Sequence, residues 1–385
     1  MATMRAVVWN GPGEPMRVEE VPTPWPGPGE ALVRVAATGV CHTDLHVIKG
    51  EVAFPAPGVL GHEISGHVVA RGPEPEEDPA VPSLAVGDRV VGAFIMPCGR
   101  CDRCREGRDD LCEPFFAQNR LRGNLFDGTS RLTRPDGSRL SMYSMAGLAD
   151  YCVVPLTALT RLPESLPLEE SAVLGCAAFT AYGAIARAGA GADVAGRSVA
   201  VVAVGGVGSN IVQLASSLGA SPVIAVDVDD AKLETARALG ADVLVNSRTG
   251  DAREAVLAAT DGAGVELVLE ALGRPETVEL GFSLLREGGQ LVVVGIAAGA
   301  ATAAIPITAM VRRGMTVTGS FGARTRRDLP EVVRLADAGA YDVRRAVTRR
   351  FTLEEAPAAY ELLDAGGIVG RAIVVMDPEQ ERGPA

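Results

Sequence analysis

The chain has 385 residues, 47% hydrophobic and 22% charged, a balance typical of a soluble globular protein and not of a disordered one. Its formal net charge of −12 argues against nucleic acid or an anionic membrane as a partner, and no apolar run is long enough to span a bilayer. The start lacks the apolar segment of a signal peptide, so we expect a cytoplasmic protein, with two domains because the length exceeds one ordinary core.

The chain changes character near residue 176. Residues 1–176 are rich in Gly, Pro and Val, and short alternating runs such as ALVRVAATGV predict a β-barrel-like domain. The Pro- and Glu-rich stretch 72–83 predicts a solvated loop. Across 177–320, apolar strands alternate with helical segments, which predicts a parallel sheet with helices on both faces. Residues 321–385 contain a further helix and strand, and we expect them to complete the first domain.

The turn AVGGVG follows a predicted strand and opens a predicted helix, as a dinucleotide-binding fingerprint must. Gly205 lets the backbone approach the pyrophosphate, Gly208 lets the helix pack closely on the strand, and Ala203 replaces the usual first glycine. Asp227 ends the next strand and favours NAD(H) over NADP(H), because its carboxylate accepts from the ribose 2′-OH and repels a 2′-phosphate. Lys232 is predicted beside the adenosine ribose. The turn residues predicted to bind the nucleotide are Ala203, Gly205, Gly206, Val207 and Gly208.

Histidine and cysteine are unevenly distributed along the chain. All four histidines, at positions 42, 46, 62 and 67, lie within 26 residues, and Cys41 precedes the first of them. Cys176 lies far downstream. Three Cys and His ligands would leave zinc one open position, as in a catalytic site. The sequence leaves open whether Cys41, His62 and Cys176 converge, because Cys176 taken alone also fits a small buried residue.

The segment PCGRCDRCREGRDDLC contains Cys98, Cys101, Cys104 and Cys112. Four closely spaced thiolates predict a closed tetrahedral zinc site that leaves no position for substrate. An iron–sulfur cluster is the main alternative. Zinc is favoured because no proline follows the last cysteine and the spacing differs from that of ferredoxins.

Together, the segment GHEISGHVVARG, the four-cysteine segment and the AVGGVG turn resemble the zinc-dependent medium-chain alcohol dehydrogenases over nearly the whole chain. The resemblance implies a GroES-like β-barrel catalytic domain at 1–176, with a structural zinc lobe at about 97–113. It also implies a doubly wound Rossmann coenzyme domain at 177–320 and a return to the catalytic domain at 321–385. Each chain would hold one catalytic and one structural Zn²⁺.

The resemblance also assigns residues around the catalytic zinc. Cys41, His62 and Cys176 would bind the metal. Asp44 would orient His62, as carboxylates commonly orient zinc-bound histidines. Glu63 would lie behind the metal and exchange as a ligand.

Further roles follow from the same resemblance. Thr43 would accept the alcohol proton, and His46 would pass it to solvent. Phe94 would form a wall of the substrate pocket. His42 and Arg371 would reach the cofactor pyrophosphate, His42 more weakly than the arginine that is common in the family because its charge depends on pH. The two remaining candidates, His67 and Cys152, are predicted to be structural.

The expected activity is reversible oxidation of a small alcohol to an aldehyde or ketone, with hydride transfer to NAD⁺, in a homodimer or homotetramer. One alternative is a formaldehyde dehydrogenase that depends on glutathione or mycothiol. Another is a carbonyl reductase of a biosynthetic pathway. A non-catalytic nucleotide-binding relative is disfavoured because a scaffold needs no proton path. The long segment 113–151 is predicted either to close the substrate cleft or to be a surface excursion.

Overall fold

The computed structural model describes residues 2–73, 83–189, 192–297 and 299–376. Most of the stretch 72–83, predicted to be a solvated loop, lies outside the described residues. Within the described parts, no helix has the length and apolar character needed to cross a membrane.

The chain divides into two compact units. The second unit consists of Ala177–Ala323 and Ala338–Arg345. The first unit contains the described residues up to Cys176, the segment Arg324–Asp337 and the residues from Ala346 onward. The sequence predicts that all of 321–385 returns to the first domain, so the assignment of 338–345 to the second unit differs from that expectation.

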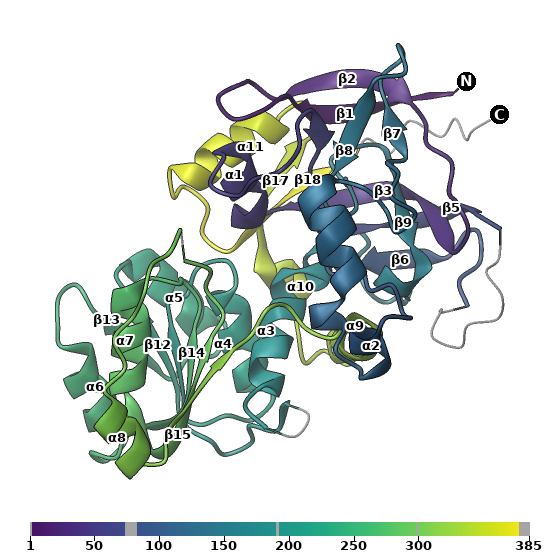
Figure 1. The fold of residues 1–385 in the computed structure, drawn as a ribbon. Coiled ribbons are helices and arrows are strands. Elements are labelled where there is room, and N and C mark those ends of the chain that lie inside the picture. The colour runs from purple at the N-terminus through teal and green to yellow at the C-terminus, as the bar shows by residue number, and fades with distance from the viewer. Residues whose placement is uncertain (1, 74–82, 190–191, 298, 377–385) are drawn as a thin grey trace. The chain divides into compact units, whose positions relative to one another are not determined.

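The first unit is built on two sheets of mostly antiparallel strands (Figure 1). The five-stranded sheet has the order β2 (Arg17–Pro22), β1 (Thr3–Trp9), β4 (Gly58–Val59), β8 (Arg139–Met142) and β7 (Leu132–Thr133). The seven-stranded sheet has the order β10 (Leu159–Arg161), β6 (Arg89–Gly92), β5 (Ile64–Arg71), β3 (Glu30–Val40), β18 (Arg371–Val375) and β17 (Val347–Thr352), and β9 (Tyr151–Pro155) also pairs with β3.

Strand β3 organises the second of these sheets, because it pairs with β5, β9 and β18. Its register sets Thr38 opposite Ile64 and Val40 opposite Ala372. The end of β3 therefore lies beside the start of β5 and the start of β18, although the three segments are far apart in sequence. The side chains of β3 are almost all buried, which fits a strand enclosed by neighbours.

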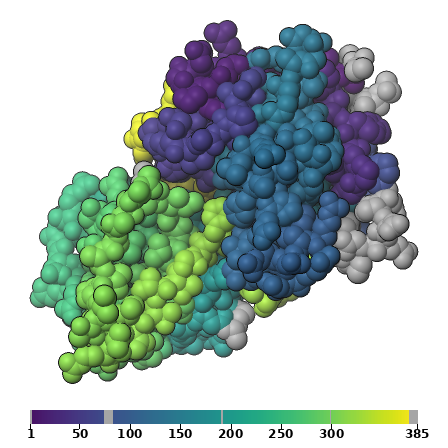
Figure 2. Space-filling view, in the orientation of Figure 1, coloured from purple at the N-terminus to yellow at the C-terminus, as the bar shows by residue number. Residues whose placement is uncertain are grey.

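The first unit also contains helices, of which all but one have fewer than ten residues among those described. They are α1 (His42–Ile48), α2 (Asp102–Arg105), α9 (Thr325–Asp337) and α11 (Ala356–Asp364), with a π-helix at Phe115–Arg120 and 3₁₀ turns at Asp109–Leu111, Leu156–Ala158 and Glu170–Gly175. The long segment 113–151 contributes the π-helix, β7 and β8, and residues of this part of the chain form a continuous surface area in the space-filling view (blue to teal, Figure 2). The segment is therefore packed into the five-stranded sheet, and its predicted role in closing the cleft stays a prediction.

The second unit contains a six-stranded parallel sheet with nearly continuous apolar strands, as is typical of a sheet covered on both faces. The strand order is β13 (Val243–Asn246), β12 (Val223–Asp227), β11 (Val199–Val202), β14 (Val265–Glu270), β15 (Leu285–Val293) and β16 (Thr316–Gly319). From β11 the next strands in sequence, β12 and β13, are added on one side, and β14 to β16 are added on the other side, so the topology switches between β11 and β14. At such a switch point the carboxyl ends of the strands form a ligand-binding crevice. The predicted barrel-like first domain and doubly wound second domain are both confirmed.

Helices connect the parallel strands in the second unit. They are α3 (Ala177–Ala186), α4 (Gly208–Ser217), α5 (Asp230–Ala238), α6 (Ala252–Ala258), α7 (Pro275–Ser283) and α8 (Ile307–Arg312), and α10 (Val343–Ala346) lies at the return to the first unit. Asp229 and Asp251 cap α5 and α6, because each side chain accepts hydrogen bonds from backbone N–H groups of the first turn.

Candidate functional site

Four side chains that could ligate a metal converge in the first unit. One ligand atom from each of Cys41, His62, Glu63 and Cys176 lies within 4.8 Å of the others, and all four residues are buried. Cys41 follows β3, and His62 and Glu63 directly precede β5. Cys176 follows the turn Glu170–Gly175. The pairing of β3 with β5 thus brings together residues that are separate in sequence.

The imidazole of His62 is oriented by Asp44. Asp44 Oδ1 lies 3.0 Å from His62 Nδ1 and also accepts from the Gly61 N–H at 3.2 Å. The Tyr360 hydroxyl donates to Asp44 Oδ2 at 2.9 Å. With Nδ1 held by the carboxylate, Nε2 faces the metal-binding group, where no described residue forms a hydrogen bond with it. Burial opposes protonation, but the Asp44 carboxylate and, to a smaller extent, the Cys41 side chain favour it and raise the pKa of His62 to about 9.

Glu63 forms the opposite side of this group. The Arg371 guanidinium at the start of β18 donates to Glu63 Oε1, and both side chains are buried. Glu63 Oε2 is buried and has no hydrogen-bond partner in the described part of the chain. A Cβ atom at Gly39 would lie 2.2 Å from that oxygen, so the glycine makes room for the carboxylate. The predicted contact of Arg371 with the pyrophosphate stays a prediction, and the sequence did not anticipate its ion pair with Glu63.

The donors of this group fit a zinc ion. Contact with the Cys176 side chain, aided by the charges of Arg371 and His62, lowers the pKa of Cys41 well below its usual range despite burial. A thiolate is the form that binds a metal. Two sulfur donors, an imidazole nitrogen and a carboxylate oxygen form a set that suits zinc. The unpartnered His62 Nε2 and Glu63 Oε2 are buried polar atoms that a cation would satisfy.

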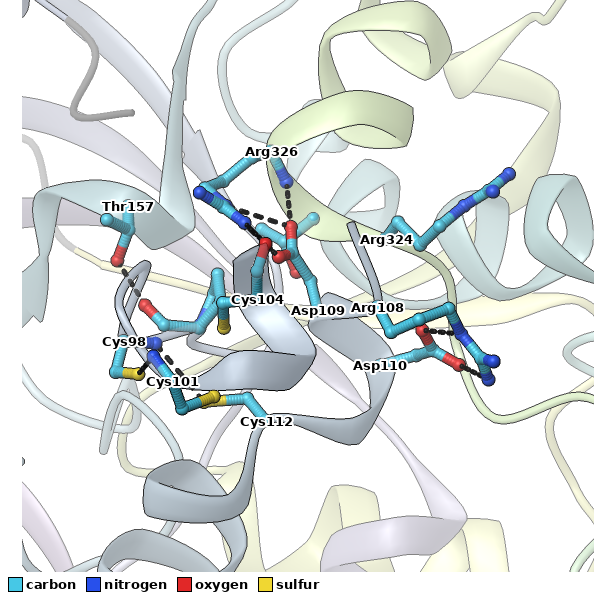
Figure 3. A network of polar contacts seen from close by, with 12 residues as sticks. Cys98, Cys101, Cys104, Arg108, Asp109, Asp110, Cys112, Thr157, Arg324 and Arg326 are labelled. Atoms are coloured by element: carbon cyan, nitrogen blue, oxygen red, sulfur yellow. Dashed lines mark hydrogen bonds and ion pairs between the residues drawn. The ribbon is translucent and has the colours of Figure 1, made fainter. Parts of the chain in front are cut away.

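The four cysteines of the lobe form a second group. One ligand atom from each of Cys98, Cys101, Cys104 and Cys112 lies within 4.8 Å of the others. Figure 3 shows the cysteine side chains gathered beside α2. The backbone N–H of Cys98 donates to Cys112 Sγ at 3.2 Å, and that of Cys101 donates to Cys98 Sγ at 3.3 Å. Such N–H groups stabilise thiolates, so this group also fits zinc.

An arginine from a distant segment attaches the lobe to the body of the first unit. Arg326, in α9, donates from Nε and Nη2 to Asp109 Oδ1 at 3.0 and 2.7 Å, and also to the carbonyl oxygen of Cys104 (Figure 3). Its backbone N–H donates to Asp109 Oδ2 at 2.9 Å. The Asp109 side chain is 2% exposed. Nothing in the local sequence around the cysteines indicated this contact.

The predicted relay residues lie in α1. Thr43 Oγ1 is 3.6 Å from Cys41 Sγ, which sets the hydroxyl beside the metal-binding group. His46 Nδ1 forms a hydrogen bond with the Glu51 carboxylate, and its side chain is 35% exposed. The hydrogen bond with His46 lowers the pKa of Glu51. The sequence did not predict Glu51 as a partner of His46. His42, the first residue of α1, is exposed.

The glycine turn lies between β11 and α4 in the second unit. A Cβ at Gly208 would lie 1.9 Å from the Ala203 carbonyl oxygen, whereas a Cβ at Gly205 would meet no atom within 4 Å. Ala203 has a φ of +70°, a conformation that favours glycine. Asp227 Oδ2 accepts from the Val204 N–H at 2.8 Å and so fixes the carboxylate at the turn. The open space at Gly205 fits the approach of a ligand backbone group.

Aromatic side chains surround the imidazole of His62. Phe94 is buried, and its ring centroid lies 5.9 Å from that of His62. The Tyr143 ring lies 6.2 Å from the His62 ring and 4.9 Å from that of Phe54. Phe94 was predicted beside the metal site, whereas Tyr143 and Phe54 were missed because aromatic residues in loops carry no periodic signal.

Three other predicted residues lie outside these groups of side chains. Lys232 lies in the first turn of α5, where its backbone N–H joins the Asp229 cap, and its side chain is partly exposed. His67 is partly exposed on β5, and burial together with Arg34 and Arg89 lowers its pKa. Cys152 is buried on β9, and burial raises its pKa. The roles predicted for these residues stay predictions.

Comparison with known proteins identifies the family. A family model of the alcohol dehydrogenase GroES-like domain matches residues 27–164, and a model of zinc-binding dehydrogenases matches residues 206–338. An alcohol dehydrogenase of Geobacillus stearothermophilus is 33% identical over 97% of this chain and 100% of the relative. The chain belongs to the zinc-dependent alcohol dehydrogenase family.

Other relatives differ in their named activities. An S-(hydroxymethyl)glutathione dehydrogenase of a Synechocystis strain is 32% identical over 94% of this chain and 97% of its own. The crystal structure of benzyl alcohol dehydrogenase from Acinetobacter calcoaceticus is 30% identical, with a TM-score of 0.87 over 98% of this chain and 100% of that chain. A zinc-binding dehydrogenase structure from Sinorhizobium meliloti with NADP bound is also 30% identical, with a TM-score of 0.81 over 97% and 100%.

Family membership confirms several of the sequence predictions. This zinc-dependent alcohol dehydrogenase family member is an oxidoreductase with a GroES-like domain, a Rossmann-like domain and two candidate zinc sites. The relatives include an alcohol dehydrogenase and an S-(hydroxymethyl)glutathione dehydrogenase, and one of the similar structures holds NADP.

Proposed function

We propose that this chain oxidises a small alcohol reversibly to an aldehyde or ketone, with NAD(H) as the hydride carrier. The observation that carries this proposal is the buried group of Cys41, His62, Glu63 and Cys176, because its His62 Nε2 and Glu63 Oε2 atoms accept or donate no hydrogen bond among the described residues. Cys41, His62 and Cys176 bind the catalytic zinc, and three such ligands leave one position for substrate.

When bound, zinc lowers the pKa of an alcohol oxygen, and the nicotinamide exchanges hydride with the carbinol carbon. Asp44 holds His62 Nδ1 so that Nε2 remains available as a ligand. Thr43, beside Cys41, accepts the alcohol proton, and the partly exposed His46 exchanges it with solvent. Glu63, paired with Arg371, balances the charge at the metal and can replace a ligand.

The lobe cysteines have a structural role in this proposal. Four thiolates complete the tetrahedral shell of zinc, so no position remains for an alcohol. The lobe is rich in charged residues, and the metal compensates for the apolar core that it lacks.

We propose that the nucleotide binds at the turn 203–208, with NAD(H) preferred over NADP(H). The Asp227 carboxylate at the end of β12 supports this preference, because it would repel a 2′-phosphate. Lys232 flanks the adenosine ribose. The exposed His42 at the start of α1 contacts the pyrophosphate. Arg371 also contacts it, in competition with the Glu63 carboxylate that already accepts from its guanidinium.

The test separates the two metal sites. We expect Cys176→Ser to lose turnover of NAD⁺ with a panel of alcohols and one equivalent of zinc, while its melting temperature stays near that of the wild type. Cys101→Ser, the matched variant in the lobe, should lose the other zinc and melt at a lower temperature. Zinc is counted by mass spectrometry. Retained turnover in Cys176→Ser would contradict the catalytic assignment.

A second candidate activity is thiol-dependent formaldehyde oxidation, which is favoured by the similarity to the Synechocystis S-(hydroxymethyl)glutathione dehydrogenase. Kinetics with formaldehyde alone and with formaldehyde plus glutathione or mycothiol would distinguish it from simple alcohol oxidation. Carbonyl reduction in a biosynthetic pathway is a third candidate, and rates with NADH and aldehydes would test it.

We also propose that the enzyme forms a homodimer, or a homotetramer built from such dimers, through β16. This strand is the outer edge of the six-stranded sheet, and Val317 within it is 38% exposed. Ile307 and Val311 in α8 are 72% and 69% exposed. An unpaired strand edge together with exposed apolar side chains favours association with a second copy.

A further inference from the structure

Arg120 has an unusual environment for a charged side chain. Among the described residues it has no ion pair and no side-chain hydrogen bond, and its Nη1 atom is buried without a partner. Its Cζ atom lies 4.2 Å from the ring centroid of Tyr143, so the guanidinium stacks on the aromatic face. A buried donor left unsatisfied costs free energy, and a ligand acceptor would remove that cost.

The backbone around Arg120 is held firmly. Arg120 ends the π-helix Phe115–Arg120, and such helices are frequent at functional sites. The preceding residue, Asn119, is 1% exposed. Its Nδ2 atom donates to the carbonyl oxygens of Met142 and Ser144, both at 3.1 Å, and its Oδ1 atom accepts from the Ser144 N–H at 2.9 Å. These bonds tie the end of the helix to both neighbours of Tyr143, so the stacked position of Arg120 is built into the fold.

Tyr143 connects Arg120 to the candidate metal site. Its ring contacts the guanidinium on one side and lies 6.2 Å from the ring of His62. Its hydroxyl is buried, and none of the described residues forms a hydrogen bond with it. Two successive contacts, guanidinium to Tyr143 and Tyr143 to His62, therefore place Arg120 in the surroundings of a metal ligand.

The chemistry of Arg120 selects the group that it can bind. A guanidinium presents N–H donors in a rigid fork that matches a carboxylate, and it has no acceptor. Its charge has no counter-ion in the described structure, and an anion would supply one. The rings of Phe54, Phe94 and Tyr143 near His62 suit an apolar or aromatic spacer.

We propose that Arg120 binds a carboxylate, or a similar anionic group, at the far end of the alcohol substrate while the carbinol carbon lies at the Cys41, His62 and Cys176 site. The inference rests on the proposed function and names its substrate class as short hydroxy acids whose anionic group is separated from the alcohol by an apolar or aromatic spacer. Arg120 is thus a specificity-determining residue.

Two pairs of alcohols test the proposal, each with and without a carboxylate. They are 4-(hydroxymethyl)benzoate with 4-methylbenzyl alcohol, and 6-hydroxyhexanoate with 1-hexanol. In the zinc-loaded enzyme, Arg120→Met should lower kcat/KM for the carboxylate member of an accepted pair by about 10- to 100-fold and change the neutral member by less than about threefold. Arg120→Lys keeps the positive charge but lacks the paired N–H donors of a guanidinium. Its kcat/KM for the carboxylate member should therefore lie between those of the wild type and Arg120→Met. The exposed Arg122→Met is the matched control and should behave as wild type.

Calorimetric binding of 4-methylbenzoate, which cannot be oxidised as an alcohol, separates this inference from the proposed function. Binding by the wild type that Arg120→Met loses, without turnover of any alcohol, would support the anion site and refute the dehydrogenase. Turnover with an unchanged carboxylate-to-neutral ratio and unchanged benzoate affinity in Arg120→Met would overturn the anion site alone. Wild-type enzyme that neither binds the benzoate nor prefers a carboxylate would also overturn it.

Discussion

We expect Gly205→Ala to weaken nucleotide binding and Gly208→Ala to lower the stability of the fold. Gly208→Ala would place a methyl group 1.9 Å from the Ala203 carbonyl oxygen, so the backbone of the turn must move. Gly205→Ala would place a methyl group where no protein atom lies within 4 Å, and the residue has no positive φ that would penalise a side chain. The structure thus requires a glycine at 208 for the packing of α4 on β11, whereas at 205 it leaves space that the proposed nucleotide would fill.

The expected magnitudes follow from these contacts. Overpacking costs about 1–3 kcal/mol, so Gly208→Ala should lower the free energy of unfolding of the second unit by about that amount. Gly205→Ala should leave it unchanged or raise it by up to about 1 kcal/mol, because alanine restricts the unfolded chain. The same variant should bind NAD⁺ at least about tenfold more weakly, a loss of about 1.4 kcal/mol, because the methyl group occupies the path of the pyrophosphate.

The assay is urea unfolding of the nucleotide-free protein, combined with calorimetric titration of NAD⁺ and NADP⁺. Unfolding is best followed by circular dichroism, since both tryptophans, Trp9 and Trp25, lie in the first unit and would not report on the second. Gly250→Ala, where a Cβ would have only an ordinary contact at 3.9 Å, controls for the general effect of the substitution. The reasoning is refuted if Gly205→Ala unfolds as easily as Gly208→Ala, or if it binds NAD⁺ like the wild type.

Two further predictions concern the ion pair between Asp109 and Arg326 and the exposed edge strand β16. Asp109→Asn should reduce the stability of the first unit by about 2–4 kcal/mol, because it leaves Arg326 without its buried counter-charge. It should also release zinc from the lobe at a lower chelator concentration, whereas Asp102→Asn, whose side chain is 88% exposed, should change stability by less than about 0.5 kcal/mol. Val317→Lys should convert the assembly to monomers in size-exclusion chromatography with light scattering, and Val86→Lys, at a residue 62% exposed in the first unit, should not. An unchanged mass for Val317→Lys would contradict association through β16.

The order of strands and helices in the second unit could be predicted from sequence, because alternation of apolar strands with helices is a local pattern that allows few arrangements. The strand β17 and helix α9 in the return segment were missed. Four of the six residues of β17 are polar or charged and exposed, so the strand has no clear apolar periodicity. Helix α9 contains Pro330, and a proline within a segment normally argues against a helix there.

The sequence alone determined the family, the two-domain architecture and the grouping of the four lobe cysteines. Signals of this kind lie within short stretches of chain, so they can be recognised without any knowledge of long-range contacts. The family resemblance implied that Cys41, His62 and Cys176 meet, but the residues alone left it open. The tertiary structure brings them together with Glu63 through the register of β3 with β5 and the packing of the turn Glu170–Gly175 on both strands.

The same reason explains the contacts that no motif indicated. Arg371 reaches Glu63, and Arg120 stacks on Tyr143, across sequence separations that no local pattern encodes. Sequence can name the chemical groups that a zinc site needs. Which buried atoms remain without a partner, and therefore where a metal or an anion can bind, depends on the packing of the folded chain.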